Sequence, residues 1–513
     1  MRLKNVRRIE SLLLPVITGL LLFCSFPKIN QAWLAWVSLV PLLFFLASVR
    51  NLRVAFLGSL IAFWIQAFLL LAWIPSVLVH YGGTGFALAW FLFAMLAVYL
   101  ALFPAFACLI IRYGMNRKGN RFLLIFPFAW LSMEYAISHF LFGGFPWLLM
   151  GYSQSSFALL MQCADLAGVY GISLVVVGVN TAIAWYFLRR PQKGAYWPVC
   201  LTALLVLGCL WYGTLAERAW GGVAASHGVA MLQGNLSADD PPDVLAWKYQ
   251  DGYKEMVRKL GSGNDDLLIL PESPTPALYE TDPSYRAVMR QLARGFPMGM
   301  VFNNIGTGLG SAGELYYNSA YFISQDGSAL ERYDKIHLVP FGEYIPYKDL
   351  FFFAGSITRD VGSFSAGSQY LTPAIDDKPV SAIICFEAVF PDLVRRLVQK
   401  GGRLIINLTN DAWYGDSAAP YQHFTIARWR AVENRRFLLR AANSGISAVI
   451  TPTGEVKSAT RILDKAVCHG QFAFLDDHSI YARFGNFLLI PCVIIVVWAI
   501  AYVCLKGNKR SLD

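Results

Sequence analysis

Long apolar runs dominate the pattern of hydrophobic and polar positions along the chain. Eight runs are long enough, at about 20 residues, to cross the hydrocarbon core of a bilayer as helices. They cover residues 10–27, 33–49, 54–77, 85–111, 122–141, 168–188, 195–215 and 485–505. Seven predicted membrane helices therefore precede residue 216, and one follows a long stretch without such runs.

Between residues 222 and 482 the pattern changes to short apolar runs that alternate with helical periodicity. The short runs begin at Val229, Asp266, Met300, Tyr316, Val380, Arg403 and Ile446, and helical patterns lie near 243–260, 282–295, 391–400 and 420–442. This alternation, with one internal hairpin, predicts a layered α/β domain with buried central strands. The predicted organisation is a seven-helix membrane domain at 1–221, an α/β domain at 222–482, and a last helix with a tail at 483–513.

Composition and charge support a membrane protein and set its orientation. The chain is 56% hydrophobic and 15% charged, with a mean hydropathy of +0.46, which is too apolar for an ordinary soluble protein. Short loops on one side of the predicted helices hold 16 Lys and Arg residues, and those on the other side hold only Lys28. Because basic loops stay in the cytoplasm, we expect both termini inside and residues 222–482 outside.

The net charge of +10 is a topology signal and not the footprint of a nucleic-acid partner. Residues 222–482 carry 24 basic and 28 acidic side chains, so the domain outside the membrane is itself slightly acidic. The seven histidines are scattered without ligand spacing, so we expect no metal and no other cofactor. Only Cys385 and Cys468 lie in this domain, so a disulfide between them is one of the alternatives at this point.

Three strand ends in this domain carry candidate chemistry. Glu272 follows a strand in LILPESP, Lys335 lies in ERYDKIHLVPFGEYIP, and Cys385 ends a strand in IICFEAVFP. A nucleophilic cysteine needs a proton acceptor, and its thiolate and the later oxyanion need positive charge nearby. Each residue alone also suits a structural role: a buried small side chain, a helix cap or a solvated charge.

In this chain order the three residues resemble the nitrilase, or carbon–nitrogen hydrolase, superfamily over most of 225–475. The resemblance rests on PE after a strand, on YDKIHLVPFGE and on CFEAVFPD. It implies an αββα sandwich with Glu272 as general base, Lys335 as transition-state stabiliser and Cys385 as nucleophile. Glu343 and Glu387 are carried over as supporting residues, with structural roles equally open.

Over nearly the whole chain the sequence resembles the apolipoprotein N-acyltransferases of the bacterial inner membrane. GGFPWLLMGYSQ from Gly143 and NDAWYGDSAAPYQH from Asn410 carry this wider resemblance. The family takes an acyl chain from a phospholipid onto its cysteine as a thioester. It then passes the chain to the N-terminal amine of a diacylglyceryl-cysteine in an apolipoprotein. The resemblance implies these two lipid partners, a membrane location and a periplasmic catalytic domain, and we expect a monomer.

Further residues are predicted to support the site or bind substrate. They are Phe386, Trp247, Trp413, Asn318 and Tyr344. Trp413 and the run Phe351, Phe352 and Phe353 are candidates for membrane contact or lipid entry, with core packing equally open. Phe386 follows the cysteine where some relatives carry tyrosine, which leaves a hydroxyl-dependent role there in doubt.

Two other functions remain open at this point. A membrane-tethered amidase would share Glu272, Lys335 and Cys385 but would release its acyl group to water. A transporter or sensor with a degenerate domain would need none of the three residues. Few charges interrupt the first seven predicted helices beyond Glu134 and Asp165, which disfavours ion-coupled transport.

Overall fold

The computed structural model divides the chain into two units. It describes residues 2–190, 192, 194–237, 240–260, 265–272, 275, 277–310, 313–347 and 364–507. One unit comprises residues 1–75, 86–215 and 484–513, and the other comprises residues 76–85 and 216–483. The first unit is helical, and the second contains the two large sheets of the described residues.

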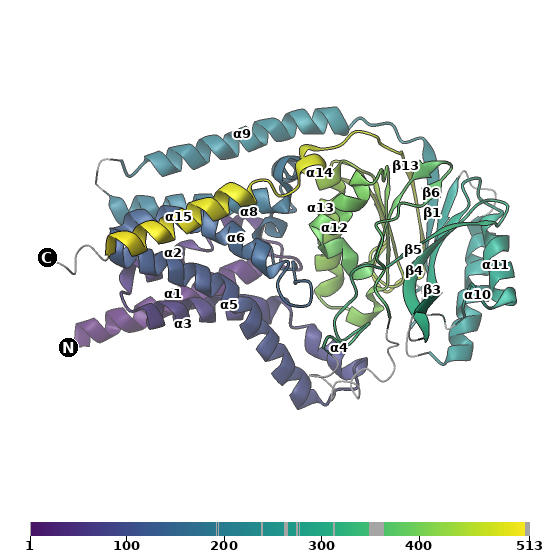
Figure 1. Ribbon diagram of the computed structural model, residues 1–513, viewed down its shortest axis with the longest axis horizontal. Coiled ribbons are helices and arrows are strands. Elements are labelled where there is room, and N and C mark those ends of the chain that lie inside the picture. The colour runs from purple at the N-terminus through teal and green to yellow at the C-terminus, as the bar shows by residue number, and fades with distance from the viewer. Residues whose placement is uncertain are drawn as a thin grey trace. The chain divides into compact units, whose positions relative to one another are not determined.

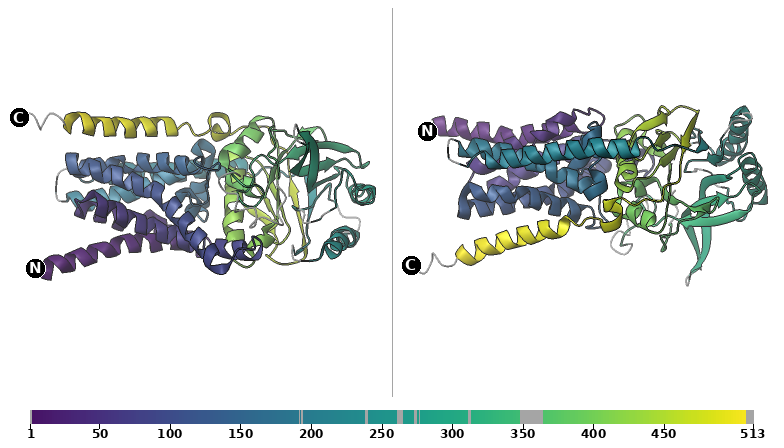
Figure 2. Two further views of the ribbon diagram at one scale, coloured as in Figure 1. Left: turned by 60° about the horizontal axis from the view of Figure 1, so that its bottom comes forward. Right: turned by 90° about the horizontal axis from the view of Figure 1, so that it is seen from above.

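The helical unit follows the long apolar runs. Its helices are α1 (Arg2–Ser25), α2 (Val40–Ser48), α3 (Leu52–Leu70), α5 (Phe86–Lys118), α6 (Phe126–Ile137), α7 (Ala158–Met161), α8 (Ala164–Arg189), α9 (Trp197–Trp220) and α15 (Leu489–Gly507), with 3-10 turns at Ala32–Trp36, Gly119–Ile125 and Met150–Gln154. Figure 2 shows the purple and blue helices of this unit side by side. Residues from Ala216 onward in α9 belong to the other unit.

Four helical stretches in the described residues are long and apolar enough to cross a membrane. They are Leu52–Leu70, Phe86–Ile137, Ala164–Arg189 and Trp197–Trp220. Shorter apolar helices lie at Leu13–Ser25, Ala32–Ser48 and Leu489–Leu505, where other spans were predicted. The membrane character is confirmed, while the full set of eight spans stays a prediction.

The predicted span 54–77 is too long. Helix α3 ends at Leu70, and α4 (Ile74–His80) begins after a short turn. Pro75 lies at the start of α4, where its missing N–H costs nothing, whereas in the interior of one continuous helix it would break a hydrogen bond. An apolar run shows where a helix can form but not where such a break divides it.

Two twisted sheets form the centre of the second unit. The six-stranded sheet has the order β13-β1-β2-β3-β4-β5, and the five-stranded sheet has the order β12-β11-β10-β9-β8. The strands of the first sheet are β1 (His227–Gln233), β2 (Leu267–Ile269), β3 (Met300–Gly310), β4 (Gly313–Ile323), β5 (Ala329–Asp334) and β13 (Ala466–Phe472). Those of the second are β8 (Ser381–Ile384), β9 (Ile405–Thr409), β10 (Leu438–Ala442), β11 (Ala448–Ile450) and β12 (Val456–Ala459).

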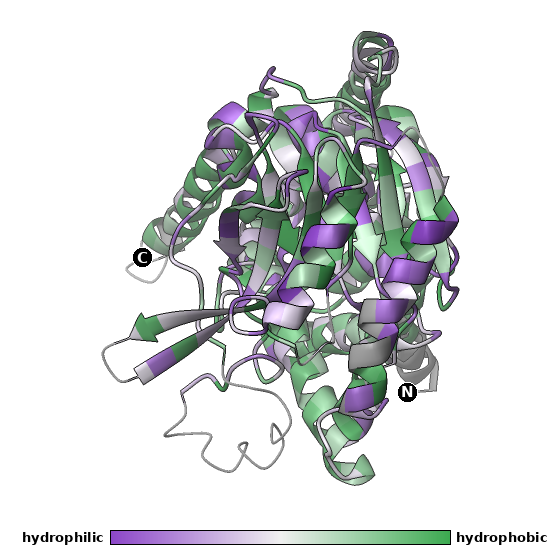
Figure 3. Cartoon of the chain, turned by 90° about the vertical axis from the view of Figure 1, so that its right-hand side faces the viewer, coloured by the Kyte–Doolittle hydropathy of each residue, from purple (hydrophilic) through white to green (hydrophobic). Residues whose placement is uncertain are grey.

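Helices cover the outer faces of the two sheets, which pack against each other. Helices α10 (Pro242–Leu260) and α11 (Pro283–Ala293) lie on the six-stranded sheet, and α12 (Pro391–Gln399) and α13 (Ala419–Asn434) lie on the other (Figure 1). Apolar side chains of α10 and α11 share one buried cluster with β1 to β4. Both helices face the viewer in Figure 3 and carry mixed green and purple colour, as amphipathic helices do. The predicted αββα sandwich is confirmed.

The predicted helix near 420–442 is wrong in its last part. Helix α13 ends at Asn434, and Arg435 takes a left-handed conformation with a φ of 51°. The chain then reverses into β10, a central strand that pairs with β9 and β11. All five residues of β10 are buried. A short strand buried on both faces lacks the alternation that would separate it from a helix in sequence.

Candidate active site

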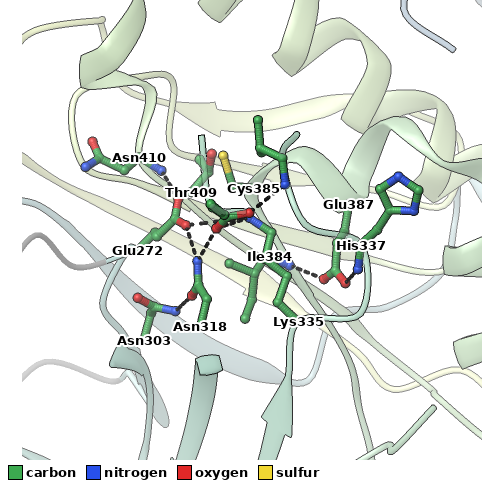
Figure 4. A network of polar contacts seen from close by, with 12 residues as sticks. Glu272, Asn303, Asn318, Lys335, His337, Ile384, Cys385, Glu387, Thr409 and Asn410 are labelled. Carbon is green, nitrogen blue, oxygen red and sulfur yellow. Dashed lines mark hydrogen bonds and ion pairs between the residues drawn. The ribbon is translucent and has the colours of Figure 1, made fainter. Parts of the chain in front are cut away.

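Strands from both sheets bring the three predicted catalytic residues together (Figure 4). Glu272 follows β2, Lys335 follows β5, and Cys385 follows β8. Strands β2 and β3 are parallel, and two antiparallel steps lead from β3 to β5, so β2 and β5 end at the same edge of their sheet. The site therefore lies where strand ends of the facing sheets meet, and Glu272 and Cys385 each follow a fully buried strand.

The Glu272 carboxylate contacts donors from three directions. Its Oε1 accepts a hydrogen bond of 2.9 Å from Asn318 Nδ2, and its Oε2 accepts one of 2.9 Å from the Asn410 backbone N–H. The Cys385 thiol also hydrogen-bonds to this carboxylate. Burial raises the pKa of Glu272, and the positive charge of Lys335 only partly opposes this effect. A carboxylate with a raised pKa suits a base that takes and returns a proton near neutral pH.

Lys335 is a buried cation held by two carboxylates. Its side chain is 1% exposed, and Nζ donates to Glu343 Oε1 at 2.8 Å and lies 3.9 Å from Glu272 Oε1. Burial alone would lower the pKa of Lys335, but the carboxylates of Glu343 and Glu272 outweigh it and raise the pKa above its usual value. The ammonium therefore keeps its charge beside the thiol.

Cys385 occupies a strained turn between β8 and the 3-10 turn Cys385–Val389. Its φ is 51°, a left-handed conformation that non-glycine residues rarely adopt and that often marks a functional site. The residue is 6% exposed, and its thiol hydrogen-bonds to Thr409. Burial and the nearby charge of Glu272 raise the pKa of Cys385, so the resting group is a thiol.

Glu343 and Glu387, both predicted as supporting residues, hold the backbone around the site. Glu343 Oε2 accepts from the Val339 backbone N–H at 2.8 Å, while its Oε1 binds Lys335. Glu387 is fully buried and accepts four hydrogen bonds, which come from the Tyr333 hydroxyl and from the backbone N–H groups of Ile336, His337 and Ile384. Burial raises the pKa of Glu387 to about 7. Glu387 thus ties the loop of Lys335 to the turn of Cys385.

Asn318 separates the two carboxylates beside Lys335. Its Nδ2 donates to Glu272 Oε1 and to Glu343 Oε1, at 2.9 and 2.8 Å. Asn303, which the sequence analysis missed, donates to Asn318 Oδ1 at 2.6 Å and so fixes which end of the amide faces the carboxylates. Asn303 lies in β3 opposite β4, and only the pairing of these strands reveals its role.

The other predicted supporting residues lie nearby or outside the described part. Phe386 is buried and packs edge-on against Phe390, with ring centroids 5.1 Å apart. Trp413 contacts Tyr81 edge to face at 4.7 Å, and the Tyr344 carbonyl accepts from the Phe341 N–H at 2.8 Å. The side chain of Trp247, and Phe351, Phe352 and Phe353 entirely, fall outside the described residues.

A second buried cluster lies behind the cysteine and was not predicted. It consists of Asp411, which follows β9, His423 in α13, and Arg440 in β10. His423 was counted in the sequence among the scattered histidines, although it ends the quoted phrase NDAWYGDSAAPYQH. Asp411 lies in the quoted phrase NDAWYGDSAAPYQH, but nothing in its spacing pointed to a pair with His423.

The described residues contain no group of three or more His, Cys, Asp or Glu side chains arranged to hold a metal ion. Cys385 and Cys468 are both free thiols. The site itself presents a thiol, a carboxylate and a buried ammonium.

Comparison with known proteins covers both parts of the chain. A family model for the N-terminal domain of apolipoprotein N-acyltransferase matches residues 18–182, and one for carbon-nitrogen hydrolases matches residues 228–467. An apolipoprotein N-acyltransferase of Geobacter metallireducens is 35% identical over 497 residues, or 94% of this chain and 93% of its own length. One of Methylococcus capsulatus is 31% identical over 513 residues, or 98% of this chain and 97% of its own length.

Among solved structures, a branch 10 member of the nitrilase superfamily from Saccharomyces cerevisiae is similar to the chain. It is 20% identical, covers 51% of this chain and 94% of its own, and gives a TM-score of 0.36.

Proposed function

The chain belongs to the apolipoprotein N-acyltransferase family, and we propose that it transfers an acyl chain from a phospholipid to the N-terminal amine of a diacylglyceryl-cysteine in apolipoproteins. This reaction completes bacterial lipoprotein maturation. It proceeds through a thioester on Cys385, so the same thiol serves the two lipid substrates in turn. The convergence of Cys385, Glu272 and Lys335 at the strand ends is the observation that supports the proposal.

In the first step the cysteine is acylated. The Cys385 thiol passes its proton to Glu272, and Sγ attacks the ester carbonyl of the phospholipid. The ester C–O bond then breaks, and the lysophospholipid oxygen takes the proton from Glu272. Lys335 remains charged throughout and stabilises first the thiolate and then the tetrahedral oxyanion.

In the second step the acyl chain moves to the acceptor. The α-amine attacks the thioester carbonyl, Glu272 takes a proton from the nitrogen, and the C–S bond breaks. The proton then returns to the thiolate, which restores the resting site. Glu272 serves as base in both half-reactions, which its raised pKa permits at neutral pH.

Labelled phospholipid provides the test of this function. Incubation of the full-length protein with a phospholipid that carries a radiolabelled acyl chain should give a covalent acyl-enzyme that hydroxylamine removes. Addition of a diacylglyceryl-cysteine lipopeptide should move the label to the peptide. An amidase would release the label as free fatty acid without an acceptor, and a transporter or sensor would gain no label; either result would refute the proposal.

The proposed location is the bacterial inner membrane. Eight helices span it, seven within residues 1–221 and one within 483–513, and the catalytic domain 222–482 faces the periplasm. Both termini are cytoplasmic, and the enzyme works as a monomer without a cofactor. Both substrates have tails in the bilayer, so a catalytic domain that is tethered at each end meets them at the interface rather than in water.

Reporter fusions test this topology. Alkaline phosphatase, which is active only outside the cytoplasm, should be active when fused near Gly261 and inactive when fused at Lys193. The expectation follows from the excess of basic residues in the short loops on one side. Activity at Lys193 but not near Gly261 would reverse the orientation and contradict the periplasmic location.

A further inference from the structure

His423 contacts the backbone of the cysteine rather than its thiol. The imidazole is fully buried, and its Nε2 lies 3.1 Å from the carbonyl oxygen of Cys385. A carbonyl oxygen only accepts hydrogen bonds, so Nε2 must carry a proton and donate it. This assignment holds with or without a proton on the other ring nitrogen.

The opposite side of the ring is fixed by a buried ion pair. Nδ1 lies 2.9 Å from Asp411 Oδ1 and 3.1 Å from Arg440 Nη2. Asp411 Oδ2 accepts from Arg440 Nη2 at 2.8 Å, and all three side chains are at most 1% exposed. Burial alone would raise the pKa of Asp411, but Arg440 and His423 outweigh it and lower the pKa to about 2, so the carboxylate stays charged.

Further hydrogen bonds connect this cluster to strands β9 and β8. Arg440 Nη1 also donates to Asn407 Oδ1, and the Asn407 side chain bonds to the Ile383 carbonyl at 3.3 Å. Ile383 lies two residues before Cys385 on β8. The cluster therefore holds the backbone at two carbonyl groups, that of Ile383 in β8 and that of Cys385 itself.

When the Cys385 carbonyl is held in place, the next backbone N–H, that of Phe386, is held in place as well. The peptide unit is planar and trans, so the N–H of Phe386 points opposite to the carbonyl that His423 holds. A backbone N–H next to a nucleophile is well placed to donate to a developing oxyanion. The left-handed conformation of Cys385 is costly, by about 1–3 kcal/mol, and persists only where its surroundings over-determine it.

We propose that His423 is a positioning residue: buttressed by Asp411 and Arg440, it holds the Cys385 carbonyl and thereby aims both the thiol and the following N–H at the acyl carbonyl. It takes no proton in the reaction and does not touch the substrate. This inference rests on the proposed acyl transfer.

The test compares replacements that differ in which contact they keep. His423→Gln places its side-chain N–H near the position of Nε2 and keeps the bond to Cys385. His423→Asn reaches only toward Asp411, and His423→Leu keeps volume without a donor. His469→Leu, at an exposed histidine of β13 in the same domain, is the matched control. Each full-length variant is assayed by thermal unfolding, phospholipid binding and single-turnover acylation with labelled phospholipid.

We expect His423→Leu and His423→Asn to slow acylation about 100-fold with phospholipid binding unchanged. The His423→Gln variant should acylate at a rate within about tenfold of the native rate. The control His469→Leu should acylate at the native rate. If His423→Leu fails to fold, the acylation rates of His423→Gln and His423→Asn are compared instead, and a faster glutamine variant supports the positioning role.

Two results would overturn the inference. The first is acylation at the native rate in His423→Asn or His423→Leu. The second is an equal loss in the glutamine and asparagine variants, which would indicate a structural role only. If the native protein itself forms no acyl-enzyme, the proposed function fails instead, so the two failures are distinguishable.

Discussion

Replacement of Cys385 by serine or alanine should abolish the acyl-enzyme and lower turnover by about 10⁴-fold or more. Serine keeps the size of the side chain, but its hydroxyl lacks the acidity and nucleophilicity of a thiol at neutral pH. Neither residue is worse than cysteine in the left-handed conformation at 385, so we expect both variants to fold. The measurement is intact mass of the purified protein after incubation with phospholipid, beside turnover with an acceptor lipopeptide.

Cys468 provides the control for this experiment. It is the other free cysteine of the second unit, is buried in β13, and contacts the Ser458 hydroxyl at 3.4 Å. Cys468→Ser should acylate at the native rate, since this thiol is not among the contacts of Glu272 or Lys335. Near-native turnover in Cys385→Ala would contradict the assignment of the nucleophile and with it the thioester route.

Glu272→Gln and Lys335→Met should fail for different reasons. Glutamine cannot accept the thiol proton, so Glu272→Gln should slow both half-reactions by roughly 10²–10⁴-fold. Methionine matches the length of lysine without its charge, so Lys335→Met should weaken thiolate formation and transition-state binding while phospholipid still binds. Because these residues act as a unit, the double variant should be little slower than the slower single variant.

Single-turnover acylation with labelled phospholipid, run beside a binding assay, measures both effects. Neither substitution replaces Asn318 or Glu343, whose hydrogen bond to each other involves neither altered side chain. A native acylation rate in Glu272→Gln would remove the general base from the mechanism. A Lys335→Met variant that is slow only because lipid no longer binds would assign the lysine to binding rather than to the transition state.

The sequence predicted the parts of the site that lie at strand ends. Glu272 and Cys385 each follow a short apolar run, and Lys335 lies in the phrase YDKIHLVPFGE that carries the family resemblance, so all three are visible without a structure. Glu343 and Glu387 were carried over from the family resemblance as supporting residues. Their actual contacts, such as the four donors around Glu387, required the two sheets to be paired first.

The features that escaped prediction depend on long-range contacts. Asn303 acts across the β3–β4 pair, and Asp411, His423 and Arg440 come from a loop, a helix and a strand that meet only in the fold. Arg440 also lies in the segment that was wrongly predicted as helix, because a charged residue in a buried strand is stable only with a partner that the sequence does not reveal. Local pattern and the family resemblance thus indicated the candidate reactive groups but not these residues, which support them.

The raised pKa of Cys385 bears on how readily its thiol is oxidised. Peroxides and disulfides react with thiolates, and a buried thiol beside a carboxylate exposes very little thiolate at rest. A cysteine with an ordinary or lowered pKa would present more thiolate to such oxidants. Burial and the charge of Glu272, which keep Cys385 protonated, therefore disfavour its oxidation in the resting protein.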